Sequence, residues 1–230
     1  MTDMSTGQKH LLERDRLGAG SALIEVGWNS AGDHEAGATT AGLADRNDAP
    51  VPAQGVKGFF AHLWPRTGTA APSAPPEINA FGILAKLGIA DDDGDVLYYH
   101  NVRGRKGKLR LEESSDANAG SGRAVFSIDL SLLPDEIFSF RVALSIHQAE
   151  ARRQSFERCR TKAYARLINP NDGQELARCE FTPDEMHGSV VELALLRGYP
   201  TGRDLIFEAR GGAYAGDIRK YVMDHGIGVC

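Results

Sequence analysis

Strict alternation of apolar and other residues is the feature that most limits what this chain can fold into. It is clearest over residues 137–147, where IFSFRVALSIH puts Phe138, Phe140, Val142, Leu144 and Ile146 on one side. Side chains of a β-strand alternate between two faces, whereas those of a helix return to one face about every 3.6 residues. The segment is therefore predicted to be a half-buried strand.

Further segments show strand-like apolar patterns and are separated by turn-forming residues. One such turn is Asn169-Pro170-Asn171-Asp172-Gly173. The predicted strands lie near 21–28, 80–87, 95–101, 123–130, 137–147, 162–169, 175–181, 189–197 and 204–210. Many short strands joined by such turns predict an all-β fold, a two-sheet β-sandwich.

Two helices are expected beside the strands. Near 215–225, Ile218, Tyr221 and Val222 are spaced to share one helix face, and Gly226 stands at the C-terminal stop position. A shorter helix is expected within AEARRQSFERC at 149–159. The fold class is thus a two-sheet sandwich with a short helix and a C-terminal helix.

An insertion rich in Ala, Gly and Pro at about 29–76 interrupts the strand pattern. Its flanks, 29–56 and 66–76, have few apolar residues to bury and are predicted to form a mobile loop. Between the flanks lies an apolar group, Phe59, Phe60, Leu63 and Trp64, which we expect to pack on the sandwich or on a partner. The whole chain, 1–230, is interpreted as one domain that carries this insertion.

Composition excludes several classes of protein. The formal net charge of -5 gives no global case for binding nucleic acid or acidic membranes. No apolar run approaches the roughly 18–20 residues of a membrane span, and the N-terminus lacks the apolar stretch of a signal peptide. Cys159, Cys179 and Cys230 form neither a CxxC spacing nor a disulfide framework, so a cytoplasmic location is expected.

The acidic segment ADDDGDVLYYHN at 90–101 was tested as a calcium loop. In an EF-hand, a glycine at position 6 follows oxygen ligands at positions 1, 3 and 5, and a glutamate stands at 12. Placing Gly94 at position 6 puts Ile89 at position 1 and His100 at position 12. The segment is not an EF-hand and is interpreted as an acidic turn.

The second half of the chain resembles the TerD family of tellurium-resistance and stress-response proteins. The family pattern His-x-Ala-Glu-x-Arg-x-Gln-x-Phe is met in HQAEARRQSF at 147–156, and Glu-Leu-Ala-Arg is met at 175–178. The first long strand, ALIEVGWNS, and the final strand, turn and helix from Asp204 also follow the family. The resemblance covers the chain outside 29–76 and the extreme termini, and it marks a diverged member.

The resemblance implies a site for calcium in acidic loops, and this chain departs from it. Glu77 and Asn79 occupy the positions of two aspartates in the family, and Asp116 and Asn118 lie in the second loop of the implied site. The family's Asp-Asp-Glu is replaced here by Gly122, Arg123 and Ala124. Calcium takes six to eight oxygen ligands, several of them charged, so calcium binding is expected to be weak or lost. No other cofactor is implied, and Asp91, Asp92, Asp93 and Asp95 are candidates for additional ligands only if their turn folds over the same site.

Two other groups of residues are candidates. His147, Glu150, Arg152 and Phe156 are expected to form a structural motif at a strand–helix corner, since no nucleophile accompanies His147 and Glu150 for acid–base chemistry. A basic patch of Arg152, Arg153, Arg158 and Arg160 would suit a phosphate or an acidic partner protein, or is a solvated helix face. Cys179 falls on an apolar face and is predicted to be core.

The function predicted from these observations is that of a non-enzymatic binding or scaffold protein. The resemblance implies a role in tellurite resistance or general stress, with other proteins, such as components of a resistance complex at the membrane, as partners. Insertion of this chain into the membrane is not expected. The alternatives are a calcium-dependent sensor that uses the acidic loops, and an enzyme whose site lies in the insertion. No catalytic constellation is visible in the insertion, so the chain is not predicted to be an enzyme.

Overall fold

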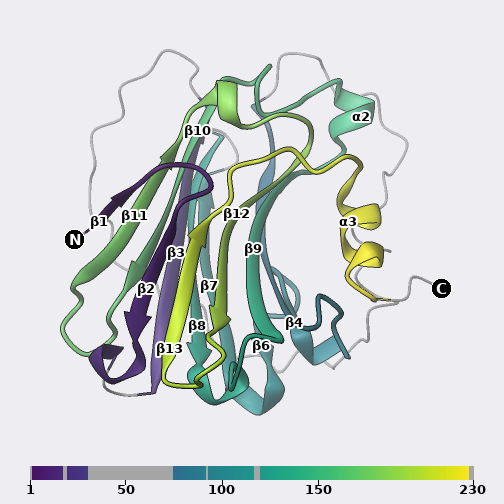
Figure 1. Ribbon diagram of the computed structural model, residues 1–230. Helices are drawn as coiled ribbons and strands as arrows, with labels where there is room; N and C mark the ends of the chain where they lie inside the picture. The colour runs from purple at the N-terminus through teal and green to yellow at the C-terminus, as the bar shows by residue number, and fades with distance from the viewer. Residues whose placement is uncertain (1, 18–19, 31–74, 92, 117–119, 228–230) are drawn as a thin grey trace.

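The protein is a β-sandwich whose two sheets face each other across one apolar core (Figure 1). The structure, a computed structural model, describes residues 2–17, 20–30, 75–91, 93–116 and 120–227. The larger sheet has the order β1-β11-β10-β3-β8-β7-β6. Its strands are β1 (Thr2–Met4), β3 (Ser21–Ser30), β6 (Arg103–Gly104), β7 (Leu109–Asp116), β8 (Ser121–Asp129), β10 (Thr161–Ile168) and β11 (Glu175–Phe181).

The smaller sheet has the order β2-β13-β12-β9-β4-β5. Its strands are β2 (Lys9–Glu13), β4 (Ile78–Lys86), β5 (Val96–Leu97), β9 (Phe138–Ile146), β12 (Val190–Gly198) and β13 (Asp204–Ala209). Within the described residues, β1 and β11 form the one parallel pair, and the other pairs are antiparallel. Antiparallel sheets can leave one face to solvent, which is why the strands alternate in sequence.

Alternating side chains of both sheets fill the space between them. Phe126 of β8 and Phe140 of β9 meet there with ring centroids 5.7 Å apart, and both are fully buried. Gly82 of β4 lies under these rings, and a Cβ at this position would collide with Phe140. A glycine inside a strand is thus explained by the close approach of an aromatic ring.

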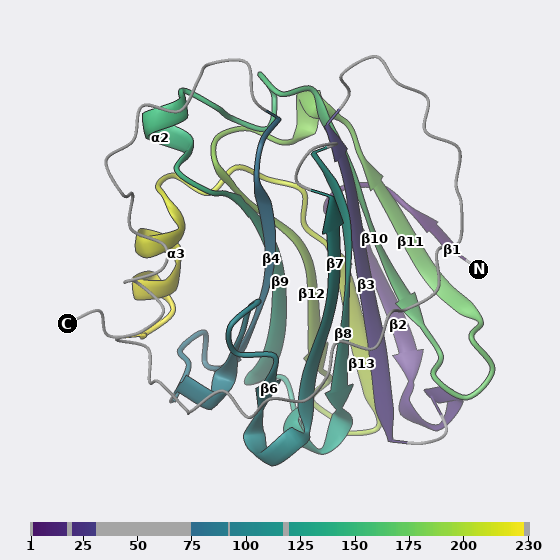
Figure 2. The same cartoon turned by 180° about the vertical axis from the view of Figure 1, so that it is seen from behind.

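A second, smaller apolar cluster lies on the outer face of the smaller sheet. There α3 (Ile218–Asp224) covers β4 and β9, and Tyr221 and Val222 are buried against residues such as Phe81 and Ile83. Asp217 caps this helix by accepting a hydrogen bond from the Lys220 amide at 2.8 Å. Figure 2 shows α3 against this sheet and α2 (Ala149–Arg152) at the end of the sandwich.

The all-β fold with a short helix and a C-terminal helix is confirmed, and most predicted strands are present within a few residues. The predicted strand at 95–101 is wrong beyond Leu97, because Tyr98 and Asn101 close a tight turn by exchanging backbone hydrogen bonds of 3.2 and 2.8 Å. The predicted short helix ends at Arg152, since Arg153 adopts the left-handed conformation at φ 53°. Strands β1, β2, β6 and β7 were not predicted.

The insertion falls almost wholly outside the described residues. The predicted mobile flanks, 29–56 and 66–76, and the apolar group Phe59, Phe60, Leu63 and Trp64 lie there, apart from residues 29–30 and 75–76. Among the helices that the structure describes, none has the length and apolarity needed to cross a membrane.

Candidate functional site

The site predicted from the sequence lies at one end of the sandwich, where three segments meet. The end of β3 and the turn between β7 and β8 are joined by a hydrogen bond of 3.1 Å from the Ser30 amide to the Gly120 carbonyl. A Cβ on Gly120 would lie 3.3 Å from Pro75, just before β4. We call this end the acidic rim and define it by Glu77, Asn79, Glu113 and Asp116; α2 lies at the same end (Figure 2).

Glu77 is held by the motif that follows β9. Its carbonyl accepts a hydrogen bond of 2.7 Å from the His147 amide. Its Oε2 lies 3.6 Å from Nη2 of Arg152, whose side chain is largely buried. The predicted metal ligand is therefore the ion-pair partner of a predicted structural residue, and an arginine beside a carboxylate opposes the binding of a cation.

The other predicted ligands are distributed over both sheets. Asn79 is opposite Ser145 in β9 and shares the outer face of the smaller sheet with Phe81. Asp116, exposed at the end of β7, is opposite Ser121 of β8. Asn118 lies outside the described residues. Within the part of the chain that the structure describes, no group of three or more His, Cys, Asp or Glu residues is arranged to hold a metal ion.

Glu113 is a member of the rim that was not singled out from the sequence. Its Oε1 accepts a hydrogen bond of 3.2 Å from the Ala80 amide, so its side chain connects β7 of one sheet to β4 of the other. Burial raises the pKa of Glu113 to about 7, against the smaller opposite effect of this hydrogen bond. The sequence did hold a signal, because Leu109, Leu111 and Glu113 alternate onto the core face of β7.

Tyr99 lies close to these carboxylates. Burial raises the pKa of its hydroxyl, and the negative charges of Glu77 and Glu113 raise it further. The charges of the rim thus act on Tyr99, and one of these charges, that of Glu77, is paired with Arg152.

The described part of the acidic turn, Asp91 and 93–95, belongs to the opposite end of the sandwich, because it follows the last residue of β4, whereas Asp92 lies outside the described residues. Asp95 is buried and receives two hydrogen bonds from Arg105, one of them 2.6 Å long between Nη2 and Oδ2. Its Oδ2 also accepts a hydrogen bond of 2.9 Å from the Asp91 amide. These aspartates therefore cannot supplement the rim, and Asp95 anchors the loop that carries Arg105.

The predicted basic patch is only partly continuous. Arg152 turns to Glu77, whereas Arg153, Arg158 and Arg160 are exposed on the turn before β10. Glu157 in this turn accepts a hydrogen bond of 2.9 Å from the Gly188 amide, and Phe156 is fully buried beneath it. Three arginines thus remain available at the surface.

Two buried glutamates organise ion pairs on the outer faces of the sheets, and neither was predicted. Glu25 of β3 accepts hydrogen bonds from Tyr164 at 2.7 Å, from Arg166 at 2.9 Å and from Arg123. Arg123, which stands where the family pattern has an acid, is paired with Glu25. These hydrogen bonds lower the pKa of Glu25 against the effect of burial, the largest single contribution.

On the smaller sheet, Glu192 has the corresponding role. Its oxygens accept hydrogen bonds from Arg141 at 3.0 Å, Arg210 at 2.9 Å and Tyr221 at 2.8 Å. Burial opposes ionisation of Glu192, yet the two arginines and Tyr221 lower its pKa overall. The contact with Tyr221 ties helix α3 to the sheet.

The described thiols are protected. Cys179 is 1% exposed, and burial raises its pKa to about 11. Burial also raises the pKa of Cys159, and Cys230 lies outside the described residues. Since the thiolate is the nucleophile, these two cysteines are poor reactants at neutral pH.

Comparison with known proteins gives consistent matches. A scan against protein families matches residues 1–225 to the TerD domain. The tellurium resistance protein TerD of Serratia marcescens is 29% identical over 167 residues, covering 71% of this chain and 84% of that protein. General stress protein 16U of Bacillus subtilis is 27% identical over 150 residues, covering 64% of this chain and 75% of that protein. A crystal structure of the unknown function protein SAV2460 has the same fold, with a TM-score of 0.53 at 15% identity over 91% of this chain and 99% of that one.

Proposed function

The chain belongs to the TerD domain family, and from this membership we propose that it is a non-enzymatic binding protein of the response to tellurite or to general stress. It would act in the cytoplasm by contact with other proteins. The observation that carries the proposal is the family match over residues 1–225, together with relatives named for tellurium resistance and general stress.

The chemistry of the described side chains supports binding rather than turnover. The conspicuous carboxylates, Glu25, Glu77, Asp95 and Glu192, are each paired with an arginine. Against the opposing effect of burial, the arginines lower the pKa of Glu25 and Glu192 and so favour the charged forms of these two groups. Glu113, whose pKa is about 7, is the exception among the carboxylates described above, and its Oε1 is engaged by the Ala80 amide. Cys179, a candidate for reaction with tellurium, is buried with a raised pKa.

A calcium-dependent sensor is the alternative function. It is favoured by the position of Glu77 and Glu113 at the same end of the sandwich, Glu77 just before β4 and Glu113 bonded to the Ala80 amide of β4. It is disfavoured by Arg152, which places a positive charge 3.6 Å from Glu77. Calcium, with its need for several charged oxygens, would have to displace this arginine.

A growth experiment in the source organism tests the proposed role. Cells without the gene should grow more poorly in tellurite or peroxide, and the wild-type gene should restore growth. A Leu144→Asp variant should not restore it, since Leu144 is fully buried in the core. Unchanged growth of the deleted strain under all stresses would remove support for the proposal.

A second experiment separates binding from catalysis. The purified chain, mixed with tellurite and with NADPH or a dithiol as reductant, is expected to leave the rate of tellurium formation at the level without protein. Cross-linking of the tagged chain in stressed cells, followed by identification of the linked proteins, should yield a reproducible partner. Multiple turnovers of tellurite per chain would overturn the non-enzymatic assignment.

A further inference from the structure

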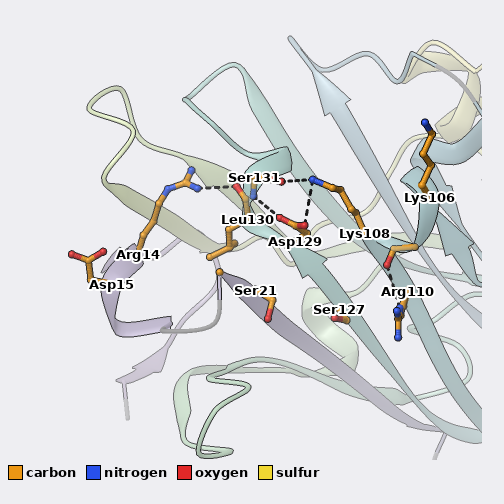
Figure 3. Close-up of a pocket in the computed structure, with 12 residues that line it drawn as sticks. Arg14, Asp15, Ser21, Lys106, Lys108, Arg110, Ser127, Asp129, Leu130 and Ser131 are labelled. Atoms are coloured by element: carbon orange, nitrogen blue, oxygen red, sulfur yellow. Dashed lines mark hydrogen bonds and ion pairs between the residues drawn. The ribbon is translucent and has the colours of Figure 1, made fainter.

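A pocket at the opposite end of the sandwich from the acidic rim has a basic, hydroxyl-rich lining. It lies where β3 begins and β8 ends, and it has a volume of about 650 Å³. The segments around it are η1 (Arg14–Leu17), η3 (Arg105–Gly107), the start of β7 and η4 (Leu130–Leu132). Figure 3 shows Arg14 on one side and Lys106, Lys108 and Arg110 on the other.

The charge of the pocket opposes that of the whole chain. Four Lys and Arg residues line it against two Asp residues, whereas the chain has a formal net charge of -5. One acid and one cation of the lining pair with each other, because Asp129 accepts a hydrogen bond of 2.8 Å from the Ser131 amide and lies 3.4 Å from Nζ of Lys108. Arg14, Lys106 and Arg110 then stand against Asp15 among the described lining residues. A local positive field on a negative protein is a feature that attracts anions.

Arg14 is fixed in place without a carboxylate partner. Its two Nη atoms donate to the backbone carbonyls of Leu130 and Leu133, the first at 2.8 Å. Its Nε is buried and has no hydrogen-bond partner among the described residues. A guanidinium so held retains its charge, and no carboxylate in the described part of the chain offsets it by an ion pair.

The opposite wall is a loop kept in an unfavourable backbone conformation. Arg105 and Lys106 have φ values of 44° and 56°, in the left-handed region that residues with a Cβ rarely occupy. The contact of Arg105 with buried Asp95 holds this loop and leaves the exposed Lys106 at the pocket. Strain maintained by a buried ion pair is characteristic of functional loops.

The remaining lining decides the class of ligand. Hydroxyl groups of Ser21, Ser127 and Ser131 come from β3, β8 and η4, and Leu130, the one apolar side chain in the lining, is 3% exposed. Among the described residues no aromatic side chain lines the pocket, so the lining offers a base nothing on which to stack. The volume exceeds what one small oxoanion fills, and the cations stand on two sides (Figure 3).

We propose that this pocket binds a small anion with two or more phosphate groups, which Arg14 contacts on one side and Lys106, Lys108 and Arg110 on the other. Arginine and lysine donate charge-assisted hydrogen bonds to phosphate oxygens, and the serine hydroxyls supply further donors. The site shares no residue with the acidic rim and does not depend on the proposed stress function.

Calorimetric titration with inorganic tripolyphosphate tests the proposal on the full chain. We expect one site per chain, with binding about tenfold or more weaker in a Lys106→Gln/Arg110→Gln variant, since both side chains are exposed and their loss leaves the core intact. A matched Arg158→Gln/Arg160→Gln variant, which removes two exposed arginines from the turn before β10, should bind as the wild type does. Orthophosphate should bind much more weakly than tripolyphosphate.

Comparison of ATP with tripolyphosphate distinguishes a nucleotide from a free polyphosphate as the ligand. ATP and tripolyphosphate are expected to bind alike, because the lining offers nothing to a base; much tighter binding of ATP would overturn the assignment of ligand class. Equal weakening in both double variants would show general attraction of anions and would overturn the site. Absence of heat and of any shift in melting temperature at 50 mM salt, where screening is modest, would overturn it as well.

Discussion

Nη2 of Arg152 lies 3.6 Å from Oε2 of Glu77, so the corner after β9 and the segment before β4 are joined by an ion pair. The side chain of Arg152 is 18% exposed, whereas that of Glu77 is 46% exposed. The sequence motif HQAEAR and the acidic rim are thus parts of one structure, in which an arginine neutralises a candidate ligand.

This pair predicts different effects for two neighbouring residues. Arg152→Ala should lower the free energy of unfolding by roughly 1 kcal/mol, because it removes buried contacts and a half-exposed ion pair. Glu150 was expected from the sequence to be part of the structural motif, but it is exposed and its side chain has no hydrogen bond or ion pair with the described residues, so Glu150→Ala should change stability by less than about 0.5 kcal/mol. Urea denaturation of both variants measures the difference, and equal losses would contradict it.

Calcium should have little effect on the folded chain. A ligand that binds only the folded state stabilises it by RT ln(1 + [L]/Kd), about 2.7 kcal/mol at a hundredfold excess over Kd. With Glu77 paired to Arg152, we expect millimolar calcium to shift the melting temperature by close to zero. A rise of several degrees that chelator reverses and Asp116→Ala abolishes would favour the sensor instead.

The Arg152→Gln variant refines the same experiment. If Arg152 is what opposes cation binding at the rim, removal of its charge should increase any response to calcium. A response that stays at zero in this variant would show that the remaining oxygens, those of Glu77, Glu113 and Asp116 among them, do not form a calcium site at all.

Alternation of apolar residues was sufficient to predict the sandwich, because the inward positions of a strand, such as Phe140 and Leu144 in β9, recur at every second residue. It was insufficient for β1 and β2, which are short, and for β7, whose second half, EESSD, is polar. A strand at the edge of a sandwich buries few side chains, so its sequence has little periodicity.

The candidate site was harder to predict because long-range pairing determines it. Glu25 stands far in the sequence from Tyr164 and Arg166, and only the register of β3 with β10 brings it to them. The acidic turn was interpreted from its sequence as a turn and not as a metal loop. The pairing of Asp95 with Arg105 within it could not be predicted, because no spacing rule identifies this partner.

A side chain added at Gly27 would collide with Tyr164. The ring of Tyr164 lies over this glycine of β3, and a Cβ there would stand 2.7 Å from the tyrosine hydroxyl oxygen. Gly27→Ala should therefore displace the ring from Glu25 and lower stability by roughly 1–3 kcal/mol. Gly212→Ala, at a position with no atom within 4 Å, serves as the control and should be nearly neutral. Equal thermal shifts for both would contradict the assigned contact.

Removal of Glu192 should be among the most damaging single changes. Glu192→Ala leaves Arg141 and Arg210 without this carboxylate and is expected to lower the free energy of unfolding by about 3 kcal/mol or more. Tyr221→Phe, which removes one hydrogen bond to Glu192, should lower it by about 1 kcal/mol. Urea denaturation near pH 7 gives both values.

A surface pair provides the comparison for Glu192. Glu180 is 73% exposed and pairs with Arg178 at 3.0 Å, so Glu180→Ala should lower stability by about 0–1 kcal/mol. Amide exchange in α3 should rise in Glu192→Ala but not in Glu180→Ala, because only Glu192 contacts Tyr221. Equal stability of the two variants would contradict the conclusion that the contacts of Glu192 hold α3 on the sheet.

The raised pKa of Glu113 predicts that its contribution to stability falls as the pH rises. Its pKa is about 7 in the fold, above the ordinary value of 4.5, so the folded state holds this proton over a range where the unfolded state has lost it. The contribution of Glu113 to stability is complete below about pH 4.5 and falls as the pH rises to about 7, after which it is constant. Glu113→Gln keeps the hydrogen-bond acceptor for the Ala80 amide and carries no charge.

The variant should therefore match the wild type near pH 4 and exceed it at pH 8, by roughly 1–2 kcal/mol once partial exposure of the carboxyl is allowed for. Urea denaturation at both pH values measures the difference. Glu112→Gln is the matched control, because Glu112 is the exposed neighbour on the same strand and should shift stability little at either pH. A Glu113→Gln effect of the same size at pH 4 and pH 8 would mean that folding leaves the pKa of this carboxyl unshifted, and that the hydrogen bond it accepts from the Ala80 amide offsets the effect of its burial.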